Sequence, residues 1–260
     1  MTEPLLSVSN VEVSFGGVRA AAGASIDVMP GEFLAIIGPN GSGKTTLINL
    51  CTGYVKPKSG TIRLDGRDIT SRKPRDITKL GIARAFQIPQ LFGEHSVIEN
   101  LTLAVAAHRG FWDGWRPLDR PAYREEAMRL LDMVGLADIA SSNAATLPEG
   151  QRKLTDIAIA LALKPRLLLL DEPTAGVSGD EKFPLMDRLT DVLRKQEVTT
   201  VFVEHDMDLV RRYADRVAVW SQGKVAANGP PEQVLTDPAV LRDVVGVASH
   251  SPCARARPPS

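Results

Sequence analysis

The sequence has few cysteines and no excess of charge of either sign. Cys51 and Cys253 are the only cysteines in 260 residues and lie far apart, so neither a disulfide framework nor a cysteine metal site is expected. The four histidines also lack the spacing of metal ligands. Lysine plus arginine and aspartate plus glutamate each total 31 residues, so no overall electrostatic field favours nucleic acid or a membrane surface. We therefore expect no nucleic-acid partner.

Long apolar runs are missing as well. No run approaches the length of a bilayer span. Residues 1–4 have neither the basic region nor the apolar region of an export signal. A chain of 260 residues, 43% of them hydrophobic, can nevertheless bury a sizeable core. These features predict a globular, soluble, cytosolic protein.

Residues 32–47 carry the clearest chemical signal. An apolar run at 33–37 predicts a buried strand, and a glycine-rich loop follows it before a helix that begins near Lys44. Backbone N–H groups freed by the glycines, together with the positive end of the helix dipole, form a concavity that suits a triphosphate. The pattern Gly-x4-Gly-Lys-Thr over residues 38–45 therefore predicts a phosphate-binding loop.

Two side chains of this loop have distinct expected tasks. Lys44 supplies a point charge for the β and γ phosphates, and the Thr45 hydroxyl is placed to ligate Mg²⁺. A glycine turn without a ligand is the alternative, but the strand before the loop and the helix after it argue against that. The candidate nucleotide-binding residues of the loop are Gly38, Pro39, Asn40, Gly41, Ser42, Gly43, Lys44, Thr45 and Thr46.

A pair of short strands is expected ahead of this loop. Residues 5–15 and 18–28 show β-type apolar patterns separated by the turn Gly16-Gly17. Phe15, at the end of the first strand, offers a flat face on which a nucleobase can stack. An ordinary core residue at a strand end would explain Phe15 equally well.

Residues 81–87 form a second β-like run that ends in the polar side chain of Gln87. Gln87 can act as donor and acceptor toward a metal-bound water. Taken alone, a solvated loop residue is the simpler interpretation of Gln87.

The pattern becomes helical from about residue 96 to residue 163. Ser96 with Glu99 resembles a capping box, and residues 122–133 show helical apolar spacing. This segment predicts a helical insertion between strands. Within it, Phe111, Trp112 and Trp115 place a large apolar surface on a glycine-broken loop, which either a protein partner or a satellite cluster would cover.

Another helix opens at residues 147–151. Pro148 is acceptable at the first helical position, and Glu149 is favourable in the first turn.

The strand predicted at 167–171 is apolar on both faces, as in a covered parallel sheet, and Asp171 and Glu172 lie at its end. Ligands of such sheets bind at the carboxyl ends of the strands.

The two adjacent carboxylates should play different roles, because neighbouring residues of a strand point to opposite faces. One can hold Mg²⁺ through water while the other faces the attacking water. A carboxylate pair that caps a turn is the alternative.

A further strand, 199–204, ends at His205 and brings a third polar group to the same sheet edge. A lone histidine at a strand end can also be structural.

The remaining patterns complete the chain. Ser178 and Glu181 resemble a second capping box that opens a helix at 182–194. Residues 216–227 are typical of a hairpin, and helices follow it to about residue 247. The proline, arginine and serine content of the last residues predicts a disordered tail at 248–260.

Read together, these motifs resemble those of an ABC-transporter ATPase, in the family's order and spacing over about residues 5–247. The motifs are residues 38–45, Gln87, residues 147–151, Asp171 with Glu172, and His205. Further runs are similar to the ATPases of branched-chain amino-acid importers. They are Phe15-Gly-Gly, Gly81-Ile-Ala-Arg-Ala-Phe-Gln87, Leu91-Phe92, Val203-Glu-His-Asp-Met207, and Asp237-Pro to Val244-Val-Gly246.

The resemblance implies an α/β fold. It is a P-loop NTPase of the ABC type, with a mostly parallel core sheet, a small antiparallel β subdomain and an inserted helical subdomain at about 88–165. Residues 1–247 would form one ABC ATPase domain.

The resemblance also implies roles at the site for ATP and Mg²⁺. Lys44 and the loop amides would hold the phosphates, while Thr45, Gln87 and Asp171 would hold Mg²⁺. Phe15 would stack on the adenine. Glu172 would be the general base for water, His205 the γ-phosphate sensor, and Gln87 the link to the permease. The signature loop, which would contact the nucleotide across a dimer, is Leu147, Pro148, Glu149, Gly150 and Gln151.

In such a family two ATPase subunits, identical or paralogous, clamp head to tail on the cytoplasmic face of the membrane. They drive two membrane permeases, which a substrate-binding protein feeds from outside. The implied function is coupling of ATP hydrolysis to uptake of branched-chain or other hydrophobic amino acids. The alternatives are the ATPase of a urea or amide importer and a soluble ABC ATPase that works without a permease.

Two positions depart from the family's pattern. Pro148 and Glu149 replace the serine and first glycine of the usual Leu-Ser-Gly-Gly-Gln signature. Ser178 stands where many relatives carry an aspartate that reaches across the dimer.

Overall fold

The computed structural model describes residues 3–109 and 120–245. Two strands, β3 (Phe33–Ile37) and β7 (Leu167–Asp171), bury every side chain. Leu34 of β3 belongs to one apolar cluster and its neighbour Ala35 to a second, because successive side chains of a strand point to opposite faces. Strands covered on both faces are typical of a parallel sheet between two layers, as the sequence predicts.

A six-stranded sheet contains both strands, in the order β10-β9-β3-β8-β7-β6. Its five strands from β9 to β6 are parallel, and β10 is antiparallel at the edge. The remaining members are β6 (Ile82–Ala85), β8 (Thr199–Val203), β9 (Arg216–Ser221) and β10 (Lys224–Gly229). The expected hairpin at 216–227 is therefore confirmed as β9 and β10.

A second sheet is antiparallel and has the order β2-β1-β4-β5. Its strands are β1 (Leu6–Phe15), β2 (Val18–Val28), β4 (Ser59–Leu64) and β5 (Arg67–Asp68). The predicted strand pair with its turn at Gly16-Gly17 is thus confirmed. Together the two sheets give the mostly parallel core and the small antiparallel β subdomain that the sequence predicts.

Helices lie on both sides of the parallel sheet and between its strands in the sequence. They are α1 (Lys44–Cys51), α2 (Pro74–Lys79), α3 (Val97–His108), α4 (Pro121–Met133), η1 (Ala137–Ile139), η2 (Ala144–Thr146), α5 (Glu149–Ala162), α6 (Gly179–Lys195), α7 (Met207–Tyr213), α8 (Pro231–Val234) and α9 (Pro238–Val245). Among the described residues, none of these helices is both long enough and apolar enough to cross a membrane.

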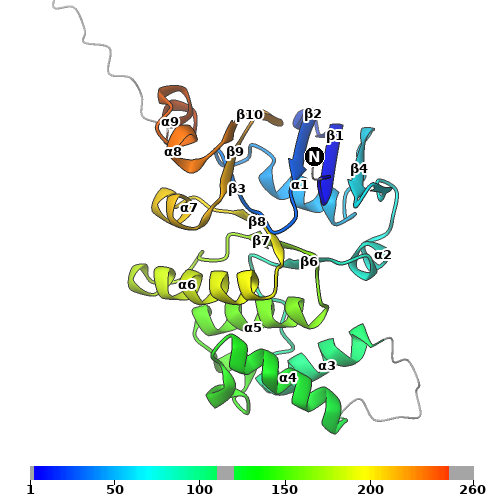
Figure 1. Cartoon of the computed structure of the whole chain (residues 1–260), viewed down its shortest axis with the longest axis vertical. Helices are drawn as coiled ribbons and strands as arrows, with labels where there is room; N and C mark the ends of the chain where they lie inside the picture. The colour runs from blue at the N-terminus through cyan, green and yellow to red at the C-terminus, as the bar shows by residue number, and fades with distance from the viewer. Residues whose placement is uncertain (1–2, 110–119, 246–260) are drawn as a thin grey trace, which may run out of the picture.

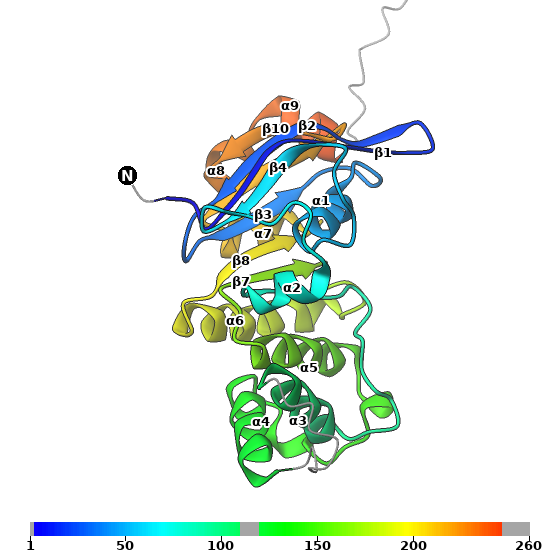
Figure 2. The same ribbon diagram turned by 90° about the vertical axis from the view of Figure 1, so that its right-hand side faces the viewer.

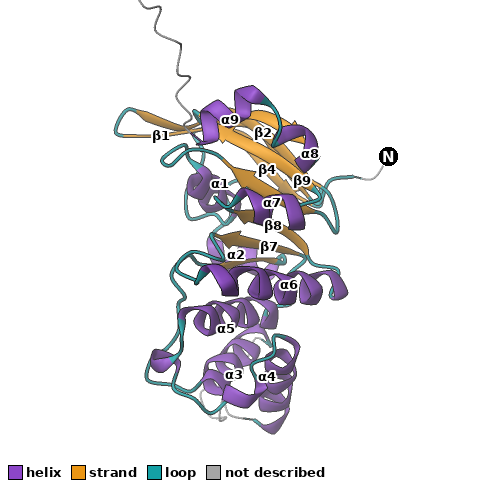
Figure 3. Ribbon diagram, turned by 90° about the vertical axis from the view of Figure 1, so that its left-hand side faces the viewer, coloured by secondary structure: helices purple, strands orange, loops and turns teal. Residues whose placement is uncertain are grey.

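Two apolar clusters explain how the layers hold together. One joins the antiparallel sheet and α1 to one face of the parallel sheet; the other joins the opposite face to α3, α4, α5, α6 and α7. Figure 1 shows the result along the long axis, with both sheets toward one end and α3 and α4 at the other. Figures 2 and 3 agree that α5 and α6 lie between the strands and the α3–α4 pair.

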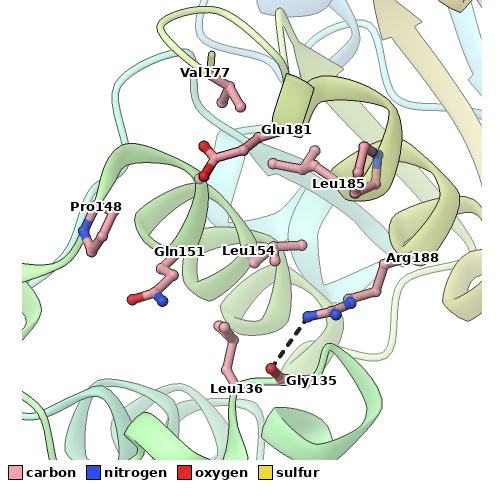
Figure 4. A pocket seen from close by; sticks show the side chains of 11 residues that line it. Gly135, Leu136, Pro148, Gln151, Leu154, Val177, Glu181, Leu185 and Arg188 are labelled. Carbon is pink, nitrogen blue, oxygen red and sulfur yellow. Dashed lines mark hydrogen bonds between the residues drawn. The ribbon is translucent and has the colours of Figure 1, made fainter. Parts of the chain in front are cut away.

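The predicted capping box of α3 is confirmed. The Ser96 Oγ accepts from the Glu99 N–H at 3.4 Å, and the Ser96 N–H donates to Glu99 Oε2 at 2.7 Å. The second predicted capping box, at Ser178 and Glu181, is wrong. The Ser178 side chain makes no cap bond, α6 begins at Gly179, and the Glu181 carboxylate faces a hollow beside α5 instead of turning back to Ser178 (Figure 4).

Pro148 also differs slightly from its expected position. It is the N-cap of α5, with ψ at 153°, and the first helical residue is Glu149. Its carbonyl oxygen accepts the Arg152 N–H at 3.0 Å; because an N-cap contributes only its carbonyl to the helix ladder, the missing N–H of proline is tolerated there.

Some predictions fall outside the described residues. They are the Phe111, Trp112 and Trp115 loop and the disordered tail at 248–260. The single-domain boundaries and the inserted subdomain at about 88–165 stay predictions, although α3, α4 and α5 do follow β6 and precede β7 in the chain.

Candidate nucleotide-binding site

The carboxyl ends of four parallel strands meet at one edge of the six-stranded sheet. Asp171 at the end of β7 pairs with Val203 at the end of β8, and Ile36 of β3 pairs with the same Val203. Ala85 of β6 pairs with Leu170 of β7. Since ligands of open parallel sheets bind at this edge, the loops that follow these strands define the candidate site.

The loop between β3 and α1 packs so closely on neighbouring backbone that two positions require glycine. A β-carbon on Gly38 would collide with the carbonyl oxygen of Trp220, and one on Gly43 with the carbonyl oxygen of Ala20. Gly43 also has a φ of 107°, a conformation that L side chains rarely adopt. Glycine therefore allows the loop to fold tightly against the start of α1.

The beginning of α1 carries donors that no side chain caps. Gly43 is the N-cap and makes no side-chain cap bond, so the first N–H groups of the helix point out of its end. The Ser42 Oγ is buried and has no hydrogen-bond partner among the described residues. Asn40, Gly41 and Thr45 are exposed on the same turn. Free N–H groups at a helix N-terminus fit a phosphate group.

Lys44 lies inside this loop. Its Nζ donates to the carbonyl oxygens of Gly38 at 2.8 Å and Pro39 at 2.9 Å, and only 6% of the residue is exposed. Burial lowers the pKa of Lys44, whereas the nearby carboxylates of Glu172 and Asp171 raise it. The loop and the strand-end carboxylates therefore share one electrostatic environment, as the sequence predicts.

Asp171 is held by a residue that the sequence analysis missed. Its Oδ2 pairs with Arg84 Nη2 of β6 at 2.8 Å, and Arg84 Nη1 donates to Asn49 Oδ1 of α1 at 2.6 Å. The Arg84 guanidinium also lies 4.8 Å from the ring centroid of Phe86. Asp171 Oδ1 accepts no hydrogen bond within the described chain. The only sequence signal was a charge inside an otherwise apolar strand.

Three of the predicted site residues come together at Glu172. Glu172 Oε2 accepts from Gln87 Nε2 at 2.9 Å, and Glu172 Oε1 lies 3.0 Å from His205 Nε2. Burial is incomplete for all three side chains, so the group opens to solvent. Glu172 follows β7 with a φ of 53°. A carboxylate, an amide and an imidazole in mutual contact can orient a water and exchange its proton.

Glu204 is a second group that the sequence analysis did not assign. It is buried, and its Oε1 accepts from the Thr174 N–H at 3.1 Å and the Thr174 Oγ1 at 2.7 Å. Its Oε2 accepts from the His205 N–H at 3.2 Å. Glu204 therefore ties the loop after β7 to the loop after β8 and fixes the backbone at His205.

Residues 147–151 lie elsewhere. Pro148, Gly150 and Gln151 of this segment line one wall of a hollow of about 270 Å³ between α5, α6 and the turn at Gly135 (Figure 4). Arg188 of α6 closes its far side by donating to the Gly135 carbonyl oxygen at 3.3 Å. No hydrogen bond or ion pair of the described residues joins 147–151 to 38–46. The fold of one chain thus leaves the predicted signature loop apart from the phosphate loop.

Phe15 is 50% exposed at the end of β1. This exposure excludes the alternative of an ordinary core residue. The predicted stacking on adenine stays a prediction.

The parallel sheet, the glycine loop before α1 and the carboxylates at the same edge define a P-loop nucleotide-binding protein. The sequence profile of the ABC transporter family matches residues 21–175.

Named relatives agree with that match. The chain is 36% identical over 259 residues to the high-affinity branched-chain amino acid transport ATP-binding protein LivG of Escherichia coli K12. The alignment covers 95% of this chain and 100% of LivG. A crystal structure of the ADP conformation of MJ1267, an ATP-binding cassette of an ABC transporter, has a TM-score of 0.82 and 33% identity over 94% of this chain and 100% of that one.

A dimeric post-hydrolysis structure of the ATP-binding cassette MJ0796, bound to ADP and Pi, is similar with a TM-score of 0.74 and 26% identity. It covers 87% of this chain and 98% of that one. The chain belongs to the ABC transporter family and is an ABC-type ATPase.

Proposed function

We propose that the chain is the ATP-hydrolysing subunit of an importer for branched-chain or other hydrophobic amino acids. The contact of Glu172 with Gln87 and His205, beside the phosphate loop, is the observation that carries the hydrolytic part. The name of LivG, a branched-chain amino acid transport protein that matches this chain over its full length, supports the substrate class.

The phosphate loop binds the nucleotide. Lys44 would exchange its two carbonyl partners for the β and γ phosphate oxygens, and the N–H groups at the start of α1 would donate to the same chain. The unpartnered Ser42 Oγ supports this assignment. Phe15, exposed at the end of β1, would stack on the adenine.

The donor set also fits Mg²⁺. Thr45, Asp171 and Gln87 supply a hydroxyl, a carboxylate and an amide oxygen, and Asp171 Oδ1 is not used within the described chain. Among the described residues no three His, Cys, Asp or Glu side chains are placed to hold a metal ion by themselves, but Mg²⁺ beside phosphates needs only one or two carboxylates. When bound, the ion neutralises charge on the β and γ phosphates.

Glu172 is the general base of this proposal. The Glu172 carboxylate would take a proton from the attacking water. Gln87 and His205 would hold that carboxylate in place from two sides. His205 would act as the γ-phosphate sensor, because its ring nitrogen lies at the same edge of the parallel sheet as the phosphate loop. Glu204 keeps the His205 backbone fixed during this exchange.

The assembly is a head-to-tail dimer in which the signature loop of one subunit completes the site of the other. The separation of 147–151 from 38–46 within one chain and the dimeric form of the similar cassette MJ0796 support this arrangement. The dimer would bind two permeases at the inner face of the cell membrane, supplied by a binding protein outside. The LivG match favours this assembly over a urea importer and over a permease-free ATPase.

Reconstitution tests the function. We would co-express the chain with candidate permease and binding-protein subunits of such an importer, place the complex in liposomes, and measure uptake of labelled leucine, valine and urea. We expect uptake of leucine and valine that requires ATP and is lost in Lys44→Ala. Uptake of urea alone would favour the urea importer, and failure of the chain to co-purify with any membrane subunit would favour the permease-free protein.

A further inference from the structure

Two buried charged residues of α5 reach the site from the side opposite the phosphate loop. Lys153 is 3% exposed and Asp156 is 5% exposed. They are three residues apart, so they lie on the same face of the helix. The N-terminal end of this helix is the signature loop at 147–151.

Lys153 binds two backbone carbonyls of the site. Its Nζ donates to the carbonyl oxygen of Glu172 at 2.9 Å and to that of Gln87 at 3.3 Å. These are the two residues whose side chains contact each other at 2.9 Å. Lys153 therefore holds the backbone on both sides of that contact.

Asp156 accepts hydrogen bonds from backbone N–H groups of the loop at 86–90, which contains Gln87. Its Oδ2 accepts from the Phe86 N–H at 2.9 Å, and its Oδ1 accepts from the Gln90 N–H at 3.3 Å. Together the two α5 side chains hold three backbone groups of residues 86–90. We call this arrangement the α5 clamp.

The clamp matters because Pro89 is the only buried residue among residues 86–90. Gln87, Ile88 and Gln90 are exposed, and the Gln90 side chain only bonds the nearby Ile88 carbonyl. Hydrogen bonds to buried charged groups are stronger than those between neutral groups. The position of Gln87 therefore depends on α5 as well as on the strand before it.

We propose that Lys153 and Asp156 are positioning residues through which α5 sets the places of Gln87 and Glu172. This inference rests on the proposed function, in which residues 147–151 contact the nucleotide of the partner subunit. A helix moves as one body over two turns, so a contact at its N-terminal end displaces Lys153 and Asp156 with it. The α5 clamp passes that displacement to the general base of the same chain.

The test uses Lys153→Met and Asp156→Asn in the assembled transporter. Lys164→Met, at an exposed lysine after α5, and Asp132→Asn, at an exposed aspartate of α4, are matched controls. We expect kcat for ATP to fall about 10- to 100-fold in each clamp variant, the effect of losing one hydrogen bond to a charged group. Affinity of the isolated chain for ATP should stay within about twofold, because neither side chain contacts the phosphate loop.

Hydrogen exchange distinguishes a clamp that transmits movement of α5 to residues 86–90 from one that only stabilises those residues. In the parent complex, ATP should change exchange at both 147–151 and 86–90. In the clamp variants the change at 147–151 should remain while the change at 86–90 is lost. Lys153→Arg, which keeps a buried donor, should restore both the coupling and most of kcat.

Three outcomes would overturn the inference. They are an unchanged kcat in both clamp variants, an ATP response at 86–90 that survives in both, and an equal loss of kcat in the controls. If Lys153→Met does not fold, Asp156→Asn alone is used for the test, because it replaces only one carboxylate oxygen with an amide nitrogen. If the parent complex itself shows no ATP-dependent uptake, the proposed function fails instead, and that result is recognised before any variant is made.

Discussion

At Glu172 the side chain and the backbone are both constrained. The carboxylate is held by Gln87 and His205, the carbonyl oxygen by Lys153, and φ is 53°. A left-handed conformation at a residue other than glycine costs roughly 1 kcal/mol and persists where surrounding contacts hold it. The contacts at Glu172 are of this kind, and they keep the carboxylate in one orientation.

Glu172→Gln should separate binding from turnover. The amide keeps the shape of the side chain but cannot take a proton, so hydrolysis should fall about 10²- to 10⁴-fold while ATP still binds. The variant should also accumulate an ATP-bound dimer, visible by size-exclusion chromatography. Glu232→Gln, at an exposed position of α8, is the control. Near-normal hydrolysis by purified Glu172→Gln would contradict the assignment.

Asp156 gives the stability of the protein a distinct pH dependence. Burial raises the pKa of Asp156 from 3.8 to about 6, although the bonds from Phe86 and Gln90 and the charge of Lys153 oppose the rise. The folded chain thus binds this proton more tightly than the unfolded chain. The contribution of Asp156 to the free energy of unfolding therefore falls as pH rises from about 4 to about 6 and is constant above that range.

Asp156→Asn should remove this dependence. A difference of about two pKa units corresponds to roughly 3 kcal/mol, so the stability of the variant relative to the parent should improve by up to that amount between pH 4 and pH 7. Urea denaturation at several pH values measures it, with Asp132→Asn as the control. Parallel curves for variant and parent would show that Asp156 does not titrate in this range.

At the scale of elements, Arg84 joins three of them. It extends from β6 to Asp171 at the end of β7 and to Asn49 of α1. The two ionic side chains are 10% and 3% exposed, so neither charge is well solvated. Such a pair stabilises little by itself, but removing one partner leaves a buried charge.

Arg84→Met should therefore destabilise the chain by about 3 to 5 kcal/mol. The double variant Arg84→Met/Asp171→Asn should recover part of that loss, because no buried charge remains. For comparison, Arg166→Met removes an ion pair to Asp65 that is about half exposed, and should change stability by less than about 1 kcal/mol. Equal effects of the two single variants in chemical denaturation would be inconsistent with the buried pair.

The N-terminal end of α5 has a proline where the family usually has serine. Pro148 is exposed at the N-cap and lacks both a hydroxyl and an N–H. A serine would add a donor toward a partner's γ-phosphate and would itself be a favourable N-cap. The composite site that uses this signature loop should therefore be the weaker one in a heterodimer.

Pro148→Ser should raise the ATPase activity of the assembled complex. One added hydrogen bond to a charged group is worth roughly 1.5 to 3 kcal/mol, or about a ten- to hundredfold change in rate if it acts in the transition state. Steady-state hydrolysis measures the change, and circular dichroism verifies the fold. An unchanged rate with an intact fold would indicate that Glu149 or Gln151 already supplies the contact.

At the scale of the whole molecule, the phosphate loop and the signature loop belong to different parts of the fold. The phosphate loop lies at the sheet edge, whereas residues 147–151 begin the helix that faces α6 across the hollow (Figures 1 and 4). In the proposed dimer a second subunit brings its signature loop to the nucleotide of the first.

Activity should therefore depend on assembly. A comparable group supplied by a partner in GTPases accelerates hydrolysis about 10³- to 10⁵-fold. The rate per subunit should rise with protein concentration and with added permease. We would measure it across a dilution series in which sedimentation reports the dimer fraction. A rate per subunit that is independent of both would contradict the head-to-tail site.

Features that depend on neighbours in the sequence could be predicted from the sequence alone. The glycines of the phosphate loop, the apolar run of β7 and the capping box at Ser96 each act within a few residues, so the local pattern determines them. The family resemblance added the fold class, which the sheet order confirms.

Only the tertiary structure decided which polar groups meet. Gln87 and Glu172 are 85 residues apart in the sequence, and Arg84 and Asp171 are 87 apart. Strand register and helix packing bring such residues together, and a sequence pattern contains neither. For the same reason Lys153 and Asp156 gave no local signal. Their charges are buried because α5 packs over the loop at 86–90, a contact between segments that are far apart in the chain.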